Sequence, residues 1–355
     1  IEDINELSKS DADFPDSLLM RPSLIIVFDN LKDELSVVYS LRYNSNQKYH
    51  DALAEANASI DFVLDLLKKP FDETYIPTNQ KKINISSNTT KDDYLKMVER
   101  AKNYIYEGDI FQVVLSQRFE SNFELPPFEL YRSLRRINPS PFLFYLNFDE
   151  FAVIGSSPEI LIRLFSDEIT VRPIAGTRPR GKDQAEDDDN KDSLLSDPKE
   201  LAEHLMLLDL GRNDVGKVSQ LGSVKVTDKF FVELYSHVMH IVSNVIGKLD
   251  SKFNMIDVLK AGFPAGTVSG APKIRAMQII EELEKERRSI YAGCVGYFSA
   301  AGDMDTCITL RTAIVKGNSM YVQAGAGIVA DSNAESEYQE CKSKASALFN
   351  AAQDA

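Results

Sequence analysis

Two pairs of glutamates, each with a spacing of three residues, lie in stretches of helical character: Glu200 and Glu203, then Glu337 and Glu340. A spacing of three places both carboxylates of a pair on one face of a helix. If the two helices meet, the four carboxylates form a site for a hard cation such as Mg²⁺, which takes a few carboxylates and completes its shell with water and substrate oxygens. The pattern is also common on solvated helix faces, so the spacing alone leaves both interpretations open.

Three segments combine small residues with groups that can bind an anion. The segment VRPIAGTRPRG holds three arginines between prolines and glycines, as in a stiff cationic loop. In FPAGTVSGAPK, Thr267, Ser269 and backbone amides precede a predicted helix that begins at Pro272, where a carboxylate could bind. In AGAGIV, Gly325 and Gly327 let the backbone approach a ligand, although the segment is not a dinucleotide fingerprint. Ordinary turns would account for such segments as well.

Two further polar side chains interrupt apolar stretches. Arg311 lies in the predicted strand CITLRTAIV, where a cation needs a partner, and a substrate carboxylate is one candidate. His240 lies in SHVMHIVS, which we interpret as an apolar helix, and a lone histidine there is more often a satisfied core residue. Glu200 has a structural alternative as well, because Asp197 and Pro198 match the N-cap and first position of a helix with Glu200 in a capping box.

The 355-residue chain has the composition of an ordinary soluble globular protein, with 43% hydrophobic and 26% charged residues. No apolar run reaches membrane-spanning length, and the first residues do not form a signal peptide. The three cysteines are scattered without metal-site spacing, as expected in a reducing cytoplasm. A net charge of −14 argues against nucleic acid as the main partner.

Hydrophobic periodicity predicts an α+β chain in which many strands are neighbours in sequence. Such strands favour antiparallel sheets flanked by helices over a doubly wound parallel sheet. We expect strands at 23–28, 35–43, 109–119, 142–148, 151–157, 160–165, 168–174, 223–228, 291–300, 305–315 and 319–329. We expect helices at 49–69, 91–107, 128–137, 197–210, 233–247, 271–287 and 334–352. Residues 70–90 are predicted to be a polar linker, and the acidic run 182–192 a mobile surface loop.

A series of segments, all in the same order, resembles the chorismate-utilising enzymes: SPE, PIAGTRPRG, AEHLMLLDLGRND, SHVMHIVS, FPAGTVSGAPK, LRTA, and the run from AGAGIV through ESEYQE. The resemblance extends from about residue 90 to the end, and within the family it is strongest to the large subunits of anthranilate synthases. It implies two orthogonal antiparallel β-sheets packed in a sandwich with helices outside. It also implies that 91–355 is the chorismate-binding catalytic domain, 71–90 a linker, and 1–70 the remnant of an N-terminal region packed on the core.

The resemblance implies chorismate as substrate and Mg²⁺ as cofactor. By motif position, Glu203 and Glu340 would be direct metal ligands, with Glu200 and Glu337 as their partners. Glu159 of SPE is the candidate acid that protonates the departing C4 oxygen, and His240 matches the residue associated with pyruvate elimination. The residues that would bind the substrate are Gly176, Thr177, Thr267, Tyr291, Arg311, Gly325, Ala326, Gly327 and Lys344.

Two positions distinguish reactions within the family. Where isochorismate and salicylate synthases have a lysine that activates water, this chain has Gln112, whose neutral amide cannot take a proton from water, so ammonia fits as the nucleophile. Where many aminodeoxychorismate synthases have a nucleophilic lysine, it has Ala175, which cannot form that covalent intermediate. Anthranilate formation is therefore expected, with an aminodeoxychorismate synthase component or an inactive regulatory homologue as the alternatives.

The resemblance also implies partners besides the substrate. Ammonia would come from a separate glutamine amidotransferase subunit, since the sequence shows no nucleophilic cysteine in a glycine-rich elbow. Pro141, Phe142 and Leu143 match half of the family's tryptophan feedback site, while the Leu-Leu-Glu-Ser motif of the other half does not occur in this sequence. Neither nucleic acid nor a membrane is expected as a partner.

Overall fold

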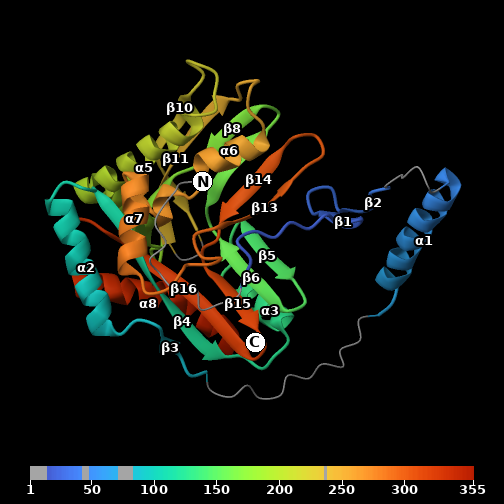
Figure 1. The fold of residues 1–355 in the computed structure, drawn as a ribbon, viewed down its shortest axis with the longest axis horizontal. Coiled ribbons are helices and arrows are strands. Elements are labelled where there is room, and N and C mark those ends of the chain that lie inside the picture. The colour runs from blue at the N-terminus through green and yellow to red at the C-terminus, as the bar shows by residue number, and fades with distance from the viewer. Residues whose placement is uncertain (1–13, 42–47, 71–82, 236–237) are drawn as a thin grey trace. The chain divides into compact units, whose positions relative to one another are not determined.

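The computed structural model describes residues 14–41, 48–70, 83–235 and 238–355 (Figure 1). The chain divides into two compact units, one formed by Pro15–Thr78 and the other by Ile1–Phe14 together with Asn79–Ala355. Most of the predicted linker, residues 71–82, lies outside the described part of the chain. No helix in the described ranges is both long and apolar enough to cross a membrane.

The unit Pro15–Thr78 contains a hairpin and a helix, as the sequence predicts. β1 (Leu24–Asp29) pairs antiparallel with β2 (Glu34–Tyr39). The following helix, α1 (Tyr49–Leu67), buries Ala52 and Ala56, which lie on one face because they are four residues apart.

The larger unit contains two seven-stranded sheets in which every described pairing is antiparallel, so the predicted α+β class is confirmed. The β11 sheet has the order β10-β11-β8-β7-β14-β13, with β9 also paired to β11. Its strands are β7 (Ile160–Phe165), β8 (Glu168–Val171), β9 (Ile174–Pro179), β10 (Lys225–Leu234), β11 (Val238–Lys248), β13 (Cys294–Phe298) and β14 (Met304–Ile308).

The β4 sheet has the order β12-β4-β16-β15-β6-β5, with β3 also paired to β4. Its strands are β3 (Ser86–Ser87), β4 (Gln112–Asn122), β5 (Phe142–Asn147), β6 (Phe151–Ser157), β12 (Gly270–Ala271), β15 (Thr312–Lys316) and β16 (Ser319–Ile328). The short strand β3 lies inside the predicted linker, so the end of that segment is part of the β4 sheet.

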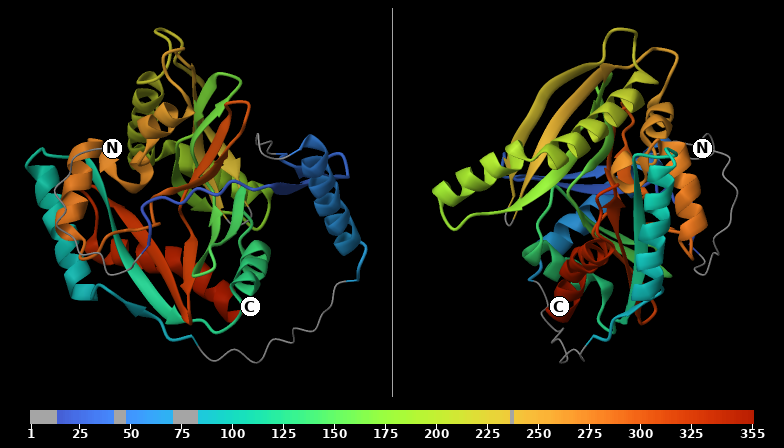
Figure 2. Two further views of the ribbon diagram at one scale, coloured as in Figure 1. Left: turned by 45° about the vertical axis from the view of Figure 1, so that its right-hand side comes forward. Right: turned by 90° about the vertical axis from the view of Figure 1, so that its left-hand side faces the viewer.

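Helices cover each sheet and bury its apolar side chains (Figures 1 and 2). The β4 sheet packs against α2 (Lys91–Tyr106), α3 (Pro127–Ile137), α7 (Lys273–Leu283) and α8 (Ala334–Gln353). The β11 sheet packs against α4 (Gln184–Ser196), α5 (Pro198–Gly216) and α6 (Met255–Gly262). Each sheet has a separate apolar core, with residues such as Leu130 and Leu348 on the first and Ile162 and Val245 on the second.

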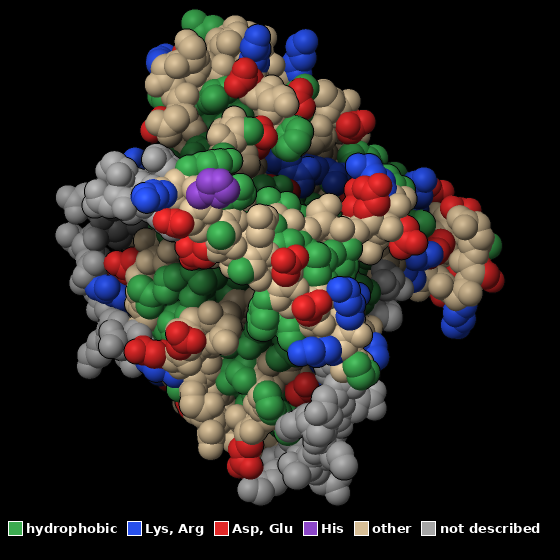
Figure 3. Space-filling view, turned by 90° about the vertical axis from the view of Figure 1, so that its right-hand side faces the viewer, with side chains coloured by type: hydrophobic (Ala, Val, Ile, Leu, Met, Phe, Trp, Pro, Cys, Tyr) green, Lys and Arg blue, Asp and Glu red, His purple; other side chains and the backbone are tan. Residues whose placement is uncertain are grey.

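The surface carries both signs of charge. On the face drawn in Figure 3, acidic and basic side chains are interspersed with apolar and neutral ones. Some charges form exposed ion pairs, such as Lys91 with Glu335 and Arg212 with Asp209. Such pairs contribute only about 0–1 kcal/mol each, so burial of the apolar cores accounts for most of the stability.

The helix predicted over 233–247 is wrong, because β10 extends to Leu234 and β11 occupies Val238–Lys248. The segment is rich in β-branched residues, among them Val238, Ile241 and Val242, which are restricted in a helix and pack well on a pleated sheet. β11 pairs with β10 on one side and with β8 and β9 on the other. His240 therefore lies on a central strand.

The loop predicted for the acidic run 182–192 is also wrong, because most of it forms α4. Asp183 caps this helix by accepting a hydrogen bond from the Glu186 amide over 3.0 Å, and acidic residues in a first turn complement the helix dipole. Asp187 is buried, where it binds the Arg180 guanidinium and accepts from the Gly181 amide over 2.6 Å. These contacts fix the run against β9. The strand β9 is not predicted from the sequence either.

The segment CITLRTAIV is not one strand. β14 ends at Ile308 and β15 begins at Thr312, and the two strands belong to different sheets. Arg311 lies at the crossover with φ of 46°, an uncommon conformation for a residue other than glycine, and its carbonyl accepts a hydrogen bond from the Ser156 amide over 3.1 Å. Because apolar residues flank Arg311 on both sides, hydrophobic periodicity does not reveal this break.

Candidate active site

The two glutamate pairs converge from α5 and α8. Burial raises the pKa of Glu203, and the negative charges of Glu200 and Glu340 raise it further. Glu340 lies on α8, so the pKa of Glu203 reflects carboxylates of both helices. Gln112, the first residue of β4, donates from Nε2 to Glu203 Oε1 over 3.2 Å. The second pair is coupled in the same way, since burial and the Glu340 charge both raise the pKa of Glu337.

Glu200 is held by Arg178, one of the three arginines of VRPIAGTRPRG. Arg178 Nη1 donates to Glu200 Oε1 over 3.1 Å, and its Nη2 donates to Asp197 Oδ2 over 2.8 Å. Asp197 also caps α5, as predicted, by accepting from the Lys199 amide over 3.0 Å. Glu200 is thus oriented by Arg178.

The expectation that the arginines of VRPIAGTRPRG bind an external anion is not supported. All three make ion pairs with protein carboxylates: Arg172 with Glu233, Arg178 with Asp197 and Glu200, and Arg180 with Asp187. The segment instead contributes Gly176, whose φ is +70° and where a β-carbon would lie only 3.1 Å from Glu200 Oε2. A glycine at this position therefore lets β9 pass close to the carboxylate.

Lys344 connects α8 to the glycine segment of β16. Its Nζ lies 2.7 Å from Glu340 Oε1 and donates to the Gly325 carbonyl oxygen over 3.0 Å. Gly327 lies next to Gln112, because a β-carbon at Gly327 would be 2.5 Å from Gln112 Nε2. The backbone of Gly325–Gly327 therefore borders the carboxylate cluster.

Glu159 is a buried carboxyl group next to the loop FPAGTVSGAPK. Burial raises its pKa to about 8, even though a hydrogen bond from Thr267 and the positive charges of Lys344 and Arg311 lower it. Thr267 Oγ1 donates to Glu159 Oε1 over 2.8 Å. At neutral pH the carboxyl group is therefore largely protonated and can act as an acid.

His240 points toward β9. Its Nδ1 lies 2.8 Å from the Gly176 carbonyl oxygen and 3.2 Å from Thr177 Oγ1. A carbonyl oxygen only accepts, so Nδ1 carries the hydrogen and Nε2 keeps its lone pair. Burial lowers the pKa of His240, which leaves the ring neutral and able to accept a proton at Nε2.

Arg311 and Tyr291 present polar groups to the same region. Burial lowers the pKa of Arg311, whose electrostatic neighbours include Tyr235 and Glu159. Among the described residues, no side chain forms an ion pair or a hydrogen bond with its guanidinium. The Tyr291 hydroxyl lies at Gly325, 2.9 Å from where a β-carbon on that residue would be. A largely desolvated cation in this position could bind a substrate carboxylate.

A family model described as chorismate binding enzyme matches residues 1–350. The chain belongs to the chorismate-binding enzyme family. It is 52% identical, over its whole length, to "Anthranilate synthase component 1" of Cereibacter sphaeroides, of which it covers 71%. It is 50% identical to the protein of the same name from Aquifex aeolicus, with 95% of this chain and 68% of that protein aligned.

Solved structures of the family share the fold. Anthranilate synthase component I from Streptococcus pneumoniae matches with a TM-score of 0.83 and 44% identity, over 91% of this chain and 71% of that one. The menaquinone-specific isochorismate synthase from Escherichia coli matches with a TM-score of 0.70 and 26% identity, over 85% and 69%.

The residues expected from this chorismate-binding family lie on several elements of the larger unit. The four glutamates, Gln112, Lys344 and the glycines of β16 form one group, and Glu159, Thr267, His240 and Gly176 border it. The expected half of a tryptophan site, Pro141, Phe142 and Leu143, lies at the start of the edge strand β5, with Leu143 paired to Ser156. Tyr235 is not predicted from the sequence as a site residue. Its ring makes an edge-to-face contact with His240, with 5.3 Å between the ring centroids.

The carboxylates of the four glutamates suit a hard metal ion such as Mg²⁺. In the described part of the chain, no three His, Cys, Asp or Glu side chains already form a ligand set. Mg²⁺ needs only one or two carboxylates, because water and substrate oxygens complete its shell. Burial and the negative charges of Glu200 and Glu340 raise the pKa of Glu203, and a bound cation would stabilise its ionised form.

Proposed function

We propose that this chain converts chorismate and ammonia to anthranilate and pyruvate, the reaction of the large subunit of anthranilate synthase in tryptophan biosynthesis. One observation carries the proposal: a protonated acid, Glu159, lies near Arg311, a desolvated cation that has no protein partner among the described residues. A substrate that brings a carboxylate and loses a hydroxyl group needs both. The names of the relatives, which share about half of their residues with this chain, support the same reaction.

Substrate binding would use the polar groups around β16. We assign one chorismate carboxylate to Arg311, Tyr291 and the backbone of Gly325, Ala326 and Gly327. The residues that would complete the pocket are Gly176, Thr177, Thr267 and Lys344.

Mg²⁺ would be held by Glu203 and Glu340, with Glu200 and Glu337 as their partners. When bound, the ion would withdraw negative charge through the ring carboxylate of the substrate. Arg178 keeps Glu200 oriented, and Lys344 keeps Glu340 from repelling its neighbours before the ion binds.

Amination requires an acid and a nucleophile. Glu159 donates its proton to the C4 oxygen, which leaves as water, while ammonia bonds to C2 and the ring double bonds shift. Gln112 cannot deprotonate water, and Ala175 cannot attack the ring, so neither residue diverts the reaction to a hydroxylated or an enzyme-bound product.

Elimination requires a base. Nε2 of His240 would take the proton from C2, after which the enolpyruvyl group leaves as pyruvate and the ring becomes aromatic. The donation from Nδ1 to the Gly176 carbonyl oxygen keeps the ring in the tautomer that this step needs.

The phrase "component 1" in the names of the relatives implies a second component. We propose a glutamine amidotransferase subunit, which would deliver ammonia to the site, in the cytoplasm. Tryptophan would be the feedback inhibitor, with Pro141, Phe142 and Leu143 as part of its site.

The decisive test mixes the purified chain with chorismate, Mg²⁺ and ammonium at mildly alkaline pH. We expect anthranilate fluorescence and pyruvate in equal amounts, and neither product without Mg²⁺. Chromatography of the consumed chorismate identifies any other product. Formation of isochorismate or aminodeoxychorismate alone would contradict the proposal.

A further inference from the structure

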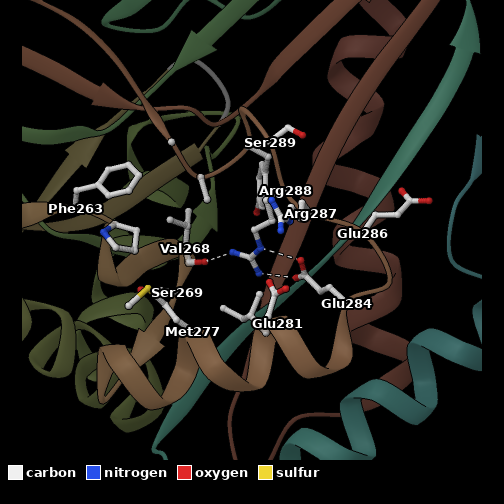
Figure 4. A pocket seen from close by; sticks show the side chains of 15 residues that line it. Phe263, Val268, Ser269, Met277, Glu281, Glu284, Glu286, Arg287, Arg288 and Ser289 are labelled. Atoms are coloured by element: carbon white, nitrogen blue, oxygen red, sulfur yellow. Dashed lines mark hydrogen bonds and ion pairs between the residues drawn. The ribbon is translucent and has the colours of Figure 1, made fainter. Parts of the chain in front are cut away.

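Arg288 joins three segments that are far apart in the sequence. Its guanidinium donates to the carbonyl oxygens of Val268 and Val114, each over 2.6 Å. It also donates to both carboxylate oxygens of Glu284, over 2.5 and 2.9 Å (Figure 4). One largely buried cation thus links the loop before α7, strand β4 and the residue that follows α7.

Glu284 directs its remaining hydrogen bonds to β4. Its Oε1 accepts from the Ser116 amide over 2.7 Å and from the Ser116 hydroxyl over 2.9 Å. The same hydroxyl accepts from Gln323 Nε2 over 2.8 Å, which extends the network to β16. The Glu284 side chain is only 4% exposed, so water competes little for these bonds.

Each segment that Arg288 or Glu284 contacts lies next to a residue of the proposed site. Val268 follows Thr267, which binds Glu159. On β4, Val114 lies opposite Gly327 and Ser116 opposite Gly325. The Arg288 guanidinium also lies over the ring of Tyr291, 5.5 Å from its centroid.

We propose that Arg288 and Glu284 are positioning residues, which hold the Thr267 loop, the glycine backbone of β16 and Tyr291 in the arrangement that catalysis needs. This inference rests on the proposed function, because it concerns the same site. Neither residue needs to touch the substrate. Lysine cannot replace Arg288, since one ammonium group lacks the planar fork that reaches Glu284 and two carbonyl oxygens at once.

The pair can be reached from solvent. A cavity of about 370 Å³ is lined by Arg288 and Glu284 together with Val268 and Tyr291 (Figure 4). A guanidinium ion is smaller than this volume. A variant that lacks the Arg288 side chain can therefore be supplied with its missing group from solution.

The test compares Arg288→Ala with Arg163→Ala. Arg163 is a matched control, because it forms a bidentate pair with Asp305 over 3.0 and 2.8 Å on the β11 sheet and contacts none of the segments above. For Arg288→Ala we expect kcat/KM for chorismate, per folded molecule, to fall at least tenfold. Methylguanidinium should restore part of this loss in Arg288→Ala and none in Arg163→Ala, and uncharged urea should restore neither.

Glu284→Gln serves as the second variant if Arg288→Ala does not fold, because the amide keeps the shape and the acceptor for Ser116. We expect this variant to lower kcat per folded molecule. Thermal melts measure the change in its stability separately. Normal kcat/KM in folded Arg288→Ala or in Glu284→Gln would overturn the inference. A wild-type chain that forms no anthranilate would instead overturn the proposed function, so the two failures are distinguishable.

Discussion

Thr267 donates its hydroxyl hydrogen to Oε1 of Glu159 over 2.8 Å, across 108 positions of sequence. The bond joins the loop FPAGTVSGAPK to the SPE segment and orients the acid of the proposed mechanism. The Ile174 backbone amide also hydrogen-bonds this carboxyl group.

Glu159→Gln keeps the shape of the side chain and removes its proton. We expect kcat to fall by about 10²- to 10⁴-fold, the usual contribution of a general acid, with little change in KM. Wild-type kcat/KM should decrease as the pH rises through about 8, where Glu159 ionises. Glu168→Gln, an exposed change on β8, is the control. Full activity in Glu159→Gln would rule out this acid.

The same group affects stability. Its pKa is about 8 in the folded chain against an ordinary value of 4.5, so its contribution to stability is fully present below pH 4.5 and is lost as the pH rises toward and through 8. The melting temperature of Glu159→Gln should therefore decline less than that of the wild type between pH 5 and 9. Parallel declines would contradict the raised pKa.

Arg311→Gln should weaken binding of chorismate, because it removes a desolvated charge that has no protein partner among the described residues. We expect KM to rise by about tenfold to a hundredfold, since hydrogen bonds to charged groups contribute about 1.5–3 kcal/mol. Steady-state kinetics would measure this, with the exposed Arg135→Gln as a control. An unchanged KM would remove Arg311 from the binding site.

Glu340→Gln should abolish Mg²⁺-dependent activity and leave the fold intact. Glu340 is about half exposed, and its partner Lys344 is equally exposed, so little stability depends on the pair. Glu335→Gln is a matched control on the same helix, where the glutamate pairs with Lys91 over 2.7 Å. Mg²⁺ titrations of activity and thermal melts would separate the two variants. Normal Mg²⁺ activation in Glu340→Gln would exclude it as a ligand.

His240→Gln should separate the two halves of the reaction. Without the base at Nε2, chorismate should still be aminated, but pyruvate should be released slowly and the aminated intermediate should accumulate. Chromatography of timed samples would detect it. Equal slowing of chorismate loss and pyruvate release would place His240 outside the elimination step.

Gly327→Ala should reduce activity through Gln112. The added β-carbon would lie 2.5 Å from Gln112 Nε2, which must then move away from Glu203. Gly216→Ala is the control, because no atom lies within 4 Å of its added β-carbon and alanine favours a helix by about 0.5–1 kcal/mol. Activity assays and thermal melts of both variants would test this. Wild-type activity in Gly327→Ala would show that this contact is not needed.

Local sequence information predicts several elements well. α2, α5 and α8 have strong caps or clear apolar faces, and β4 and β16 have long runs of strand-forming residues. The helix predicted around His240 fails because an apolar run can be a helix or a central strand, and only pairing with β9 and β10 decides between them. The loop predicted at 182–192 fails because Asp187, the buried charge of the run, pairs with Arg180, which lies outside the run.

The α+β class, the two glutamate pairs and the motifs of the chorismate-binding family can all be recognised from the amino-acid sequence. These features depend on residue types and short spacings, which are local properties. Three further features emerge only from the folded chain: Arg178 binds Glu200, Arg311 lies at a crossover between sheets, and burial raises the pKa of Glu159. Hydrogen-bond partners, backbone strain and desolvation depend on segments that are distant in sequence, so no local pattern encodes them.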